Sequence, residues 1–161
     1  MTTAINSLTF WQFSLNVYRH PQVAKTLLEW QQTDEKNVNL CLFLLYLDTL
    51  KVQLSAPQLG QLVAAIAPFN TQFTAPLRTL RTQLKKQHNA LPHYETMRAQ
   101  LLATELSFEQ QEQHLLVDAY QQLFVDTHTK PDNLALYISH RALAEKPDLN
   151  QILHQLINTA E

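Results

Sequence analysis

Apolar and polar positions recur along the chain with helical spacing, and the clearest element is a segment that is apolar on every side. Residues 40–47 read Leu-Cys-Leu-Phe-Leu-Leu-Tyr-Leu, without a charged side chain. A helix that is apolar all round is normally enclosed by other helices. The pattern therefore predicts that residues 38–50 form the buried central helix of a bundle. Because a membrane span needs ~20 apolar residues, we expect no membrane-spanning segment.

Prolines and polar capping residues divide the rest of the chain into amphipathic helices. The predicted helices run from Asn6 or Ser7 to the residue before Pro21, from Pro21 to a polar loop at 33–37, from a capping box at 55–58 to about Pro68, from 74–76 to a loop at 89–92, and from 93 to about 124. Ser107 with Gln110 could begin a new helix, so one long helix and two collinear ones both remain open for 93–124. Two further helices follow, one capped by Asp132 and one by Asp148.

Composition supports an all-helical chain. Of the 161 residues, 45% are apolar, 29 are Leu and 18 are Gln, whereas Gly60 is the one glycine. Leu and Gln favour helices, and scarce glycine disfavours sheet folds with many turns and loops that cradle phosphate. We predict an all-α, single-domain bundle of about six to eight helices over residues 1–161, around the central helix 38–50.

The charged residues are unevenly distributed, although the net charge is only −2. Lys and Arg outnumber Asp and Glu nine to five up to Thr104, a net of +4, but from Glu105 onward they are three against nine, a net of −6. An antiparallel hairpin could bring together a basic and an acidic stripe, namely Arg78, Arg81, Lys85 and Lys86, and Glu105, Glu109 and Glu112. Solvated faces are the simplest interpretation. The alternative interpretation is that the basic stripe forms a groove that binds an anionic ligand. The sequence lacks the aromatic residues between basic ones that would indicate a nucleic-acid partner.

The first predicted helix carries two apolar stripes instead of one. At 100° per residue they are Leu8, Trp11, Leu15 and Tyr18, and, roughly opposite, Phe10, Phe13 and Val17. Either the helix is sandwiched between core elements, or one stripe meets a partner, another copy of the chain or an apolar ligand. Replacing Phe10 and Phe13 with serine would distinguish these interpretations. Our candidate interaction surface is Phe10, Phe13, Val17, Arg78 and Arg81.

Two polar side chains fall within the apolar central helix and suggest an alternative site. Asn39 and Tyr46 would lie inside the core or at its rim, where an amide needs partners. Together with Trp11 they could surround a small-molecule pocket between the first and central helices.

No pattern of catalytic or metal-binding residues emerges. Glu-x-x-His pairs and the His-Glu-x-x-His pattern are absent, and the seven histidines lack ligand spacing. Cys41 lies in the apolar run and is expected to be an inert core thiol, typical of a reducing compartment. The N-terminus lacks the pattern of a signal peptide. We predict no catalytic residue, no cofactor and no metal, and a cytoplasmic location.

Several segments resemble those of a known family. They are Phe10-Trp11-Gln12-Phe13-Ser14, Tyr18-x-x-Pro21-x-Val23, Val38-Asn39-Leu40-x-Leu42-Phe43 and Pro76-Leu77-Arg78-x-Leu80-Arg81. In this order, over roughly residues 8 to 120, they resemble an uncharacterised bacterial family of short helical proteins catalogued as a domain of unknown function. The resemblance implies a compact cytoplasmic protein and supplies no activity or catalytic residue.

These observations favour a non-catalytic protein-interaction or adaptor module that binds a protein partner or forms a homo-oligomer. The alternative is a helical enzyme or carrier with the pocket around Trp11, Asn39 and Tyr46. A nucleic-acid adaptor ranks third and would need salt-dependent binding through Arg78 and Arg81.

Overall fold

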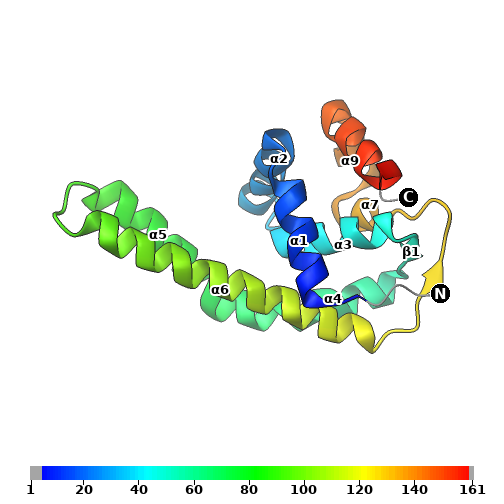
Figure 1. Cartoon of the computed structure of the whole chain (residues 1–161), viewed down its shortest axis with the longest axis horizontal. Coiled ribbons are helices and arrows are strands. Elements are labelled where there is room, and N and C mark those ends of the chain that lie inside the picture. Colours follow the sequence, from blue (N-terminus) through cyan, green and yellow to red (C-terminus); the bar gives the residue numbers. More distant parts are fainter. Residues whose placement is uncertain (1–4, 160–161) are drawn as a thin grey trace.

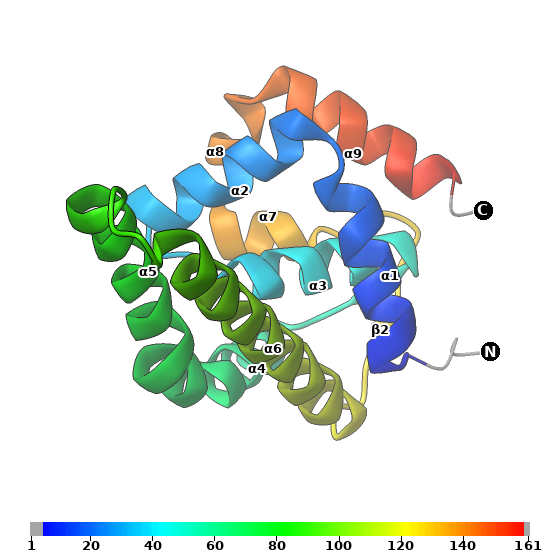
Figure 2. The ribbon, with the colours of Figure 1, turned by 60° about the vertical axis from the view of Figure 1, so that its left-hand side comes forward.

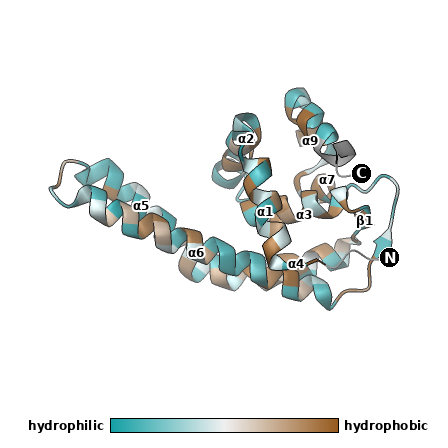
Figure 3. Cartoon of the chain, viewed as in Figure 1, coloured by the Kyte–Doolittle hydropathy of each residue, from teal (hydrophilic) through white to brown (hydrophobic). Residues whose placement is uncertain are grey.

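The central helix predicted from the apolar run is the core of the protein. The computed structural model describes residues 5–159, with side chains for residues 5–155. Helix α3 (Val38–Thr49) begins at Asn37, whose side chain accepts a hydrogen bond from the Leu40 N–H at 2.9 Å. Every residue from Asn39 to Thr49 is buried. The prediction is confirmed, and Figure 3 shows hydrophobic positions of α3 behind α1.

Helices from both ends of the chain surround α3 (Figures 1 and 2). Their bounds are α1 Ser7–Tyr18, α2 Pro21–Thr33, α7 Asn133–Ile138, α8 His140–Ala144 and α9 Pro147–Thr159. Helix α1 is capped by Asn6, which accepts from the Thr9 N–H at 2.9 Å, as predicted. Helices α1, α2, α7 and α9 all contact α3. The all-α fold around a buried helix is therefore confirmed.

The two predicted C-terminal caps are wrong. Asp132 occupies the N-cap position of α7, but its side chain makes no capping hydrogen bond. The carboxylate of Asp48 on α3 caps α7 instead, accepting from the Asn133 N–H at 2.9 Å and the Leu134 N–H at 3.3 Å. Helix α9 begins at Pro147, so Asp148 lies within its first turn.

A two-stranded sheet, which we did not predict from the sequence, contacts α3 just after its C-terminal end. Strand β1 (Val52–Gln53) pairs antiparallel with β2 (Asp126–Thr127), with Val52 opposite Thr127. The side chain of Asn133 joins α7 to β1 and the residue after it, because it donates to Val52 O at 2.6 Å and accepts from the Leu54 N–H at 2.7 Å.

The helix after the capping box does not stop at Pro68, contrary to prediction. Helix α4 (Ala56–Phe69) continues through a π-helical turn, η1 (Asn70–Thr74), into α5 (Ala75–His88). The capping box itself is confirmed. An interior proline removes one helical hydrogen bond and costs ~3 kcal/mol, which packing around the turn can offset. Phe69 and Phe73 pack against Phe108, with ring centroids 5.5 and 6.1 Å apart.

Helix α6 (Tyr94–Gln121) returns antiparallel along α5, and the two form an arm that projects from the body (Figure 1). Residues 93–124 therefore contain one long helix. Ser107 does not cap a new helix, because its hydroxyl donates back to the Ala103 carbonyl at 3.2 Å. No residue of α5 is buried. In the described part of the chain, no helix combines the length and the apolar character needed to cross a membrane.

Candidate functional site

A concave site with apolar and charged walls lies where the arm leaves the body. This cleft has a volume of about 550 Å³ and is bounded by α1, α2, the start of α3, and the arm helices α5 and α6. Its apolar walls are Trp11, Leu15, Tyr18, Leu28, Val38, Leu42 and Leu106. Four of these stand out from the surface: Leu15, Tyr18, Leu28 and Leu106 are 47%, 38%, 41% and 48% exposed.

Helix α1 uses its two stripes differently, and the assignment of Phe10 and Val17 to the interaction surface was wrong. Phe10 and Val17 are fully buried, so no partner can reach them. Phe10 packs against Phe43 and Tyr46 of α3, with ring centroids 4.9 and 5.7 Å apart. Phe13 is half-buried against Tyr46, at 4.9 Å. The opposite stripe, Leu8, Trp11, Leu15 and Tyr18, is the accessible one, and most of it borders the cleft.

A buried polar network forms the wall where α1, α3 and α6 meet. Gln113 of α6 is 2% exposed, and its Nε2 donates to Ser14 Oγ at 3.0 Å and to Asn39 Oδ1 at 3.2 Å. The hydroxyl of Ser14 donates to the Phe10 carbonyl at 3.0 Å, so Ser14 Oγ can only accept from Gln113. This fixes the orientation of the Gln113 amide. Its Oε1 is buried and has no hydrogen-bond donor.

The arm contributes an ion-pair cluster to the same cleft. Arg81 Nε lies 2.6 Å from Glu105 Oε2, and Arg78 Nε lies 3.4 Å from Glu105 Oε1. Glu109 is held less closely, since its nearest cation is Arg78 Nη2 at 3.6 Å. The predicted meeting of the basic and acidic stripes is thus confirmed for these four residues. Because both arginines are paired with carboxylates, the structure does not offer them as a free basic groove.

Burial and neighbouring charge perturb the titration of two groups at the cleft. Burial raises the pKa of Glu109, Arg78 lowers it, and the negative charges of Glu105 and Glu112 raise it further. Burial also raises the pKa of Tyr18, and Glu109 adds to that increase. These shifts place Tyr18 of α1 and Glu109 of α6 in one electrostatic environment.

A second buried carboxylate, Glu112, lies on α6 after Glu105 and Glu109. Glu112 is fully buried, and its Oε1 accepts from Asn37 Nδ2 at 2.8 Å and from Asn70 Nδ2 at 3.1 Å. Its Oε2 is buried without a partner. Glu112 therefore joins the start of α3 to the π-helical turn through neutral amides, and no cation pairs with it among the described residues.

Two of the three residues predicted to surround a pocket lie together. Trp11 and Asn39 both line the cleft, but Tyr46 does not. Tyr46 packs against Phe10 and Phe13 on the other side of α1, and its hydroxyl donates to Thr9 Oγ1 at 3.2 Å.

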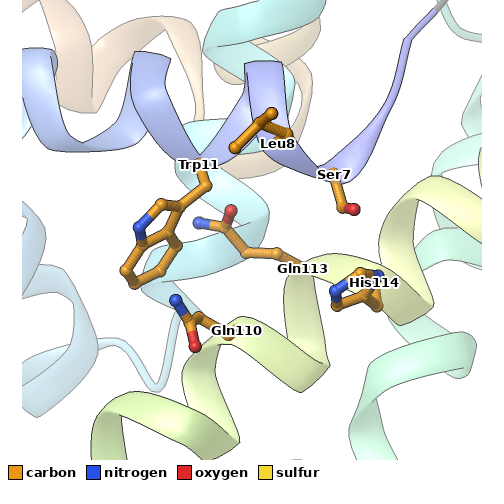
Figure 4. A pocket seen from close by; sticks show the side chains of 6 residues that line it. All are labelled: Ser7, Leu8, Trp11, Gln110, Gln113 and His114. Carbon is orange, nitrogen blue, oxygen red and sulfur yellow. The ribbon is translucent and has the colours of Figure 1, made fainter.

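A smaller hollow of about 260 Å³ adjoins the cleft and shares Trp11 and Gln113 with it. Figure 4 shows the Gln113 amide reaching from α6 toward α1, beside the Trp11 ring, with Gln110 and His114 on the α6 side. Our sequence reasoning missed Gln113. The available signal was helical spacing, because Leu106, Glu109 and Gln113 fall at i, i+3 and i+7 on one face of α6.

Metal-ligating side chains and the thiol do not gather at one site in the described part of the chain. The described residues contain no group of three His, Cys, Asp or Glu side chains placed to hold a metal ion. Cys41 is a buried free thiol, and burial raises its pKa to about 12, so it is not a thiolate nucleophile at neutral pH.

Comparison with known proteins identifies the family. A model of a protein family matches residues 9–116, which is more than half of the chain. The family is described as proteins of unknown function, DUF2390. The chain belongs to DUF2390. No curated protein and no solved structure matches it. Every cleft residue from Trp11 to Gln113 falls within the DUF2390 match, whereas β2, α7, α8 and α9 lie beyond it.

Proposed function

We propose that this DUF2390 protein is a non-catalytic cytoplasmic protein-interaction module that holds an apolar segment of a partner protein in the cleft. The main observation behind this proposal is that four large apolar side chains on three helices line this one cleft. Each of them is more than one-third exposed: Leu15, Tyr18, Leu28 and Leu106. Surface patches of this kind mark interaction sites in soluble proteins. The buried free thiol of Cys41 supports a reducing compartment.

The walls of the cleft favour a protein segment as the occupant. Apolar side chains alternate with amides and ion pairs, including Gln31, Gln32, Arg78 and Glu105. Such a mixture fits an amphipathic helix or strand, which fills the apolar positions while its backbone and flanking groups meet the polar rim.

Selection from a displayed peptide library tests this function. We expect selected peptides to bind the unaltered chain and to lose about tenfold in affinity for Leu15→Gln, because a wall of the cleft becomes polar. The matched control is Leu91→Gln, since Leu91 is 45% exposed but lies at the tip of the arm. Failure to obtain peptides that depend on Leu15, or self-association of the chain that depends on Leu15, would contradict the partner assignment.

The volume of the cleft favours one second candidate, a small-molecule carrier. About 550 Å³ lies within the range of small-molecule sites, and Trp11 and Asn39 supply an aromatic face and an amide. Native mass spectrometry of the purified chain tests this candidate. If the protein is a carrier, the unaltered chain should retain a compound that the Leu15→Gln variant has lost. If the mass of the unaltered chain equals that of the polypeptide alone, a retained ligand is excluded.

A further inference from the structure

The exposed side of α1 indicates which conformation the partner segment has, an inference that rests on the proposed function. Leu8, Trp11, Leu15 and Tyr18 follow one another at intervals of three, four and three residues, and we call these four side chains the α1 seam. At 100° per residue they fall within an arc of about 80°. Intervals of three and four residues are those of the apolar positions of a heptad, through which one helix packs along another.

The α1 seam is not packed against another helix of the described chain. Leu8, Leu15 and Tyr18 are 64%, 47% and 38% exposed, and none of the four seam residues belongs to the hydrophobic core. Leu8 and Trp11 line the smaller hollow, whereas Trp11, Leu15 and Tyr18 line the cleft. The seam therefore runs along both hollows, over about 15 Å of helix.

The backbone around the cleft is unsuited to an extended partner. An extended segment binds by pairing its backbone with a free strand edge. The cleft is bounded by helices, and within helices the N–H and C=O groups bond along each helix. The sheet of the described residues pairs 52–53 with 126–127, and none of these four residues lines the cleft. A helical partner needs no such edge, because its own backbone groups are already paired.

The charged side chains of the cleft are balanced by one another. Arg81 Nε lies 2.6 Å from Glu105 Oε2, and Arg78 lies 3.4 Å from Glu105 Oε1 and 3.6 Å from Glu109 Oε1. A further charge of either sign, pressed against these walls, would lose water without gaining a free counter-charge. The cleft therefore favours an occupant whose contact face is apolar and uncharged.

We propose that the partner segment is an amphipathic helix that packs lengthwise along the α1 seam, with uncharged apolar side chains at intervals of three and four residues. Helix α1 crosses α6 (Figure 1). The partner helix lies beside α1 and across α6 at Leu106, which lines the cleft, and Gln110, which lines the smaller hollow. Its polar face stays in solvent.

Two displayed peptide libraries of equal length test the conformation of the partner. In one, apolar positions are randomised at intervals of three and four residues in a background of alanine and glutamine; in the other they alternate with serine and threonine. We expect peptides whose binding depends on Leu15 from the first library alone. A selected peptide labelled with ¹³C and bound to the unaltered full chain should show the NMR chemical shifts of a helix.

Leu8→Gln distinguishes a helix along α1 from an occupant confined to the cleft, because Leu8 lines the smaller hollow but not the cleft. We expect it to weaken binding of the selected peptide about tenfold, as Leu15→Gln does. The matched control is Leu136→Gln, which should leave the affinity unchanged. Leu136 is an exposed leucine of α7 that borders neither hollow.

The charge of the contact face is tested on the peptide itself. Replacing one of its contact leucines with lysine, and separately with glutamate, should weaken binding about tenfold in each case, because neither charge finds a free counter-charge. Tighter binding of either peptide would overturn the assignment of an uncharged contact face.

Other outcomes separate this inference from the proposed function. If peptides that depend on Leu15 bind in extended form, or bind Leu8→Gln unchanged, the interaction module stands and the helix along α1 is wrong. If neither library yields a peptide that depends on Leu15, the proposed function fails and this inference fails with it. The chemical shifts are measured on the unaltered chain, so they remain decisive even if a variant does not fold.

Discussion

Phe10 and Leu8 lie two residues apart on α1 and have opposite environments. Phe10 is fully buried against Phe43 and Tyr46, whereas Leu8 is 64% exposed. We predict that Phe10→Ser lowers the free energy of unfolding by about 4 kcal/mol, because it leaves a cavity and buries a hydroxyl. Leu8→Ser should change it by less than about 0.5 kcal/mol. Urea denaturation followed by circular dichroism measures both, and equal effects would contradict the assignment of the two stripes.

Asp48 couples the stability of the fold to pH. Burial raises its pKa from 3.8 to about 6, against the opposing hydrogen bonds from Asn133 and Leu134. Between pH 4 and 6 the unfolded chain has lost this proton while the folded chain keeps it, so rising pH favours unfolding. We predict that this one group lowers the free energy of unfolding by about 2–3 kcal/mol across that window, with no further loss above it.

Comparison with Asp48→Asn isolates this effect from the other titrating groups. The variant cannot ionise, so its stability relative to the unaltered chain should rise as pH increases from 4 to 6. Urea denaturation at several pH values measures the difference. Parallel pH profiles for the two chains would show that Asp48 titrates normally.

At the scale of elements, the ion pairs between α5 and α6 orient the arm more than they stabilise it. Arg81 contacts Glu105 through two nitrogens, at 2.6 and 3.3 Å, and the Glu105 side chain is only 8% exposed. We predict a coupling of about 1 kcal/mol in a double-mutant cycle of Arg81→Ala and Glu105→Ala, because the pair is bidentate and half-buried. Thermal unfolding of the four chains measures it. A coupling of zero at low salt would mean that the contact adds nothing.

Local patterns predicted most helix starts, because a start depends on residues a few positions apart. Asn6 and Ser55 each cap the helix expected from their position, and the helix expected from residue 38 begins there, capped by Asn37. Pro68 misled the prediction, because contacts with distant Phe108 sustain the helix beyond it. The C-terminal cap was missed for the same reason, since Asp48 reaches α7 from α3.

The cleft was harder to predict than the fold. Both stripes of α1 are apolar, and only the fit of the Phe10 ring against α3 decides which one is buried. The sequence did indicate Trp11, Asn39 and the two arginines. Helical spacing could have placed Gln113 on the same face of α6 as Leu106 and Glu109, but not its hydrogen bonds, because these depend on the directions of Ser14 and Asn39 on two other helices.

At the scale of the whole molecule, the body and the arm differ in how their helices are stabilised. Helix α3 is buried along nearly its whole length, whereas α5 has no buried residue. We predict that the amides of α3 exchange with solvent only through global unfolding, and that those of α5 exchange through local openings of lower free energy. Hydrogen exchange followed by NMR, with increasing urea, measures this. Equal protection of α3 and α5 would indicate that arm and body open as one unit.

The π-helical turn before the arm has a consequence for chain length. The Ala75 N–H donates to the carbonyl of Asn70, five residues back, so this turn holds one residue more than an α-helical turn. Each residue of an α-helix advances by about 100°. The turn therefore absorbs the extra residue, and deleting one residue from 70–74 would let it close as an α-helical turn, with Arg78 and Arg81 still directed at Glu105. A residue deleted within α5 between Ala75 and Arg78 has no such reserve, and it would rotate both arginines by that angle about the helix axis, away from Glu105.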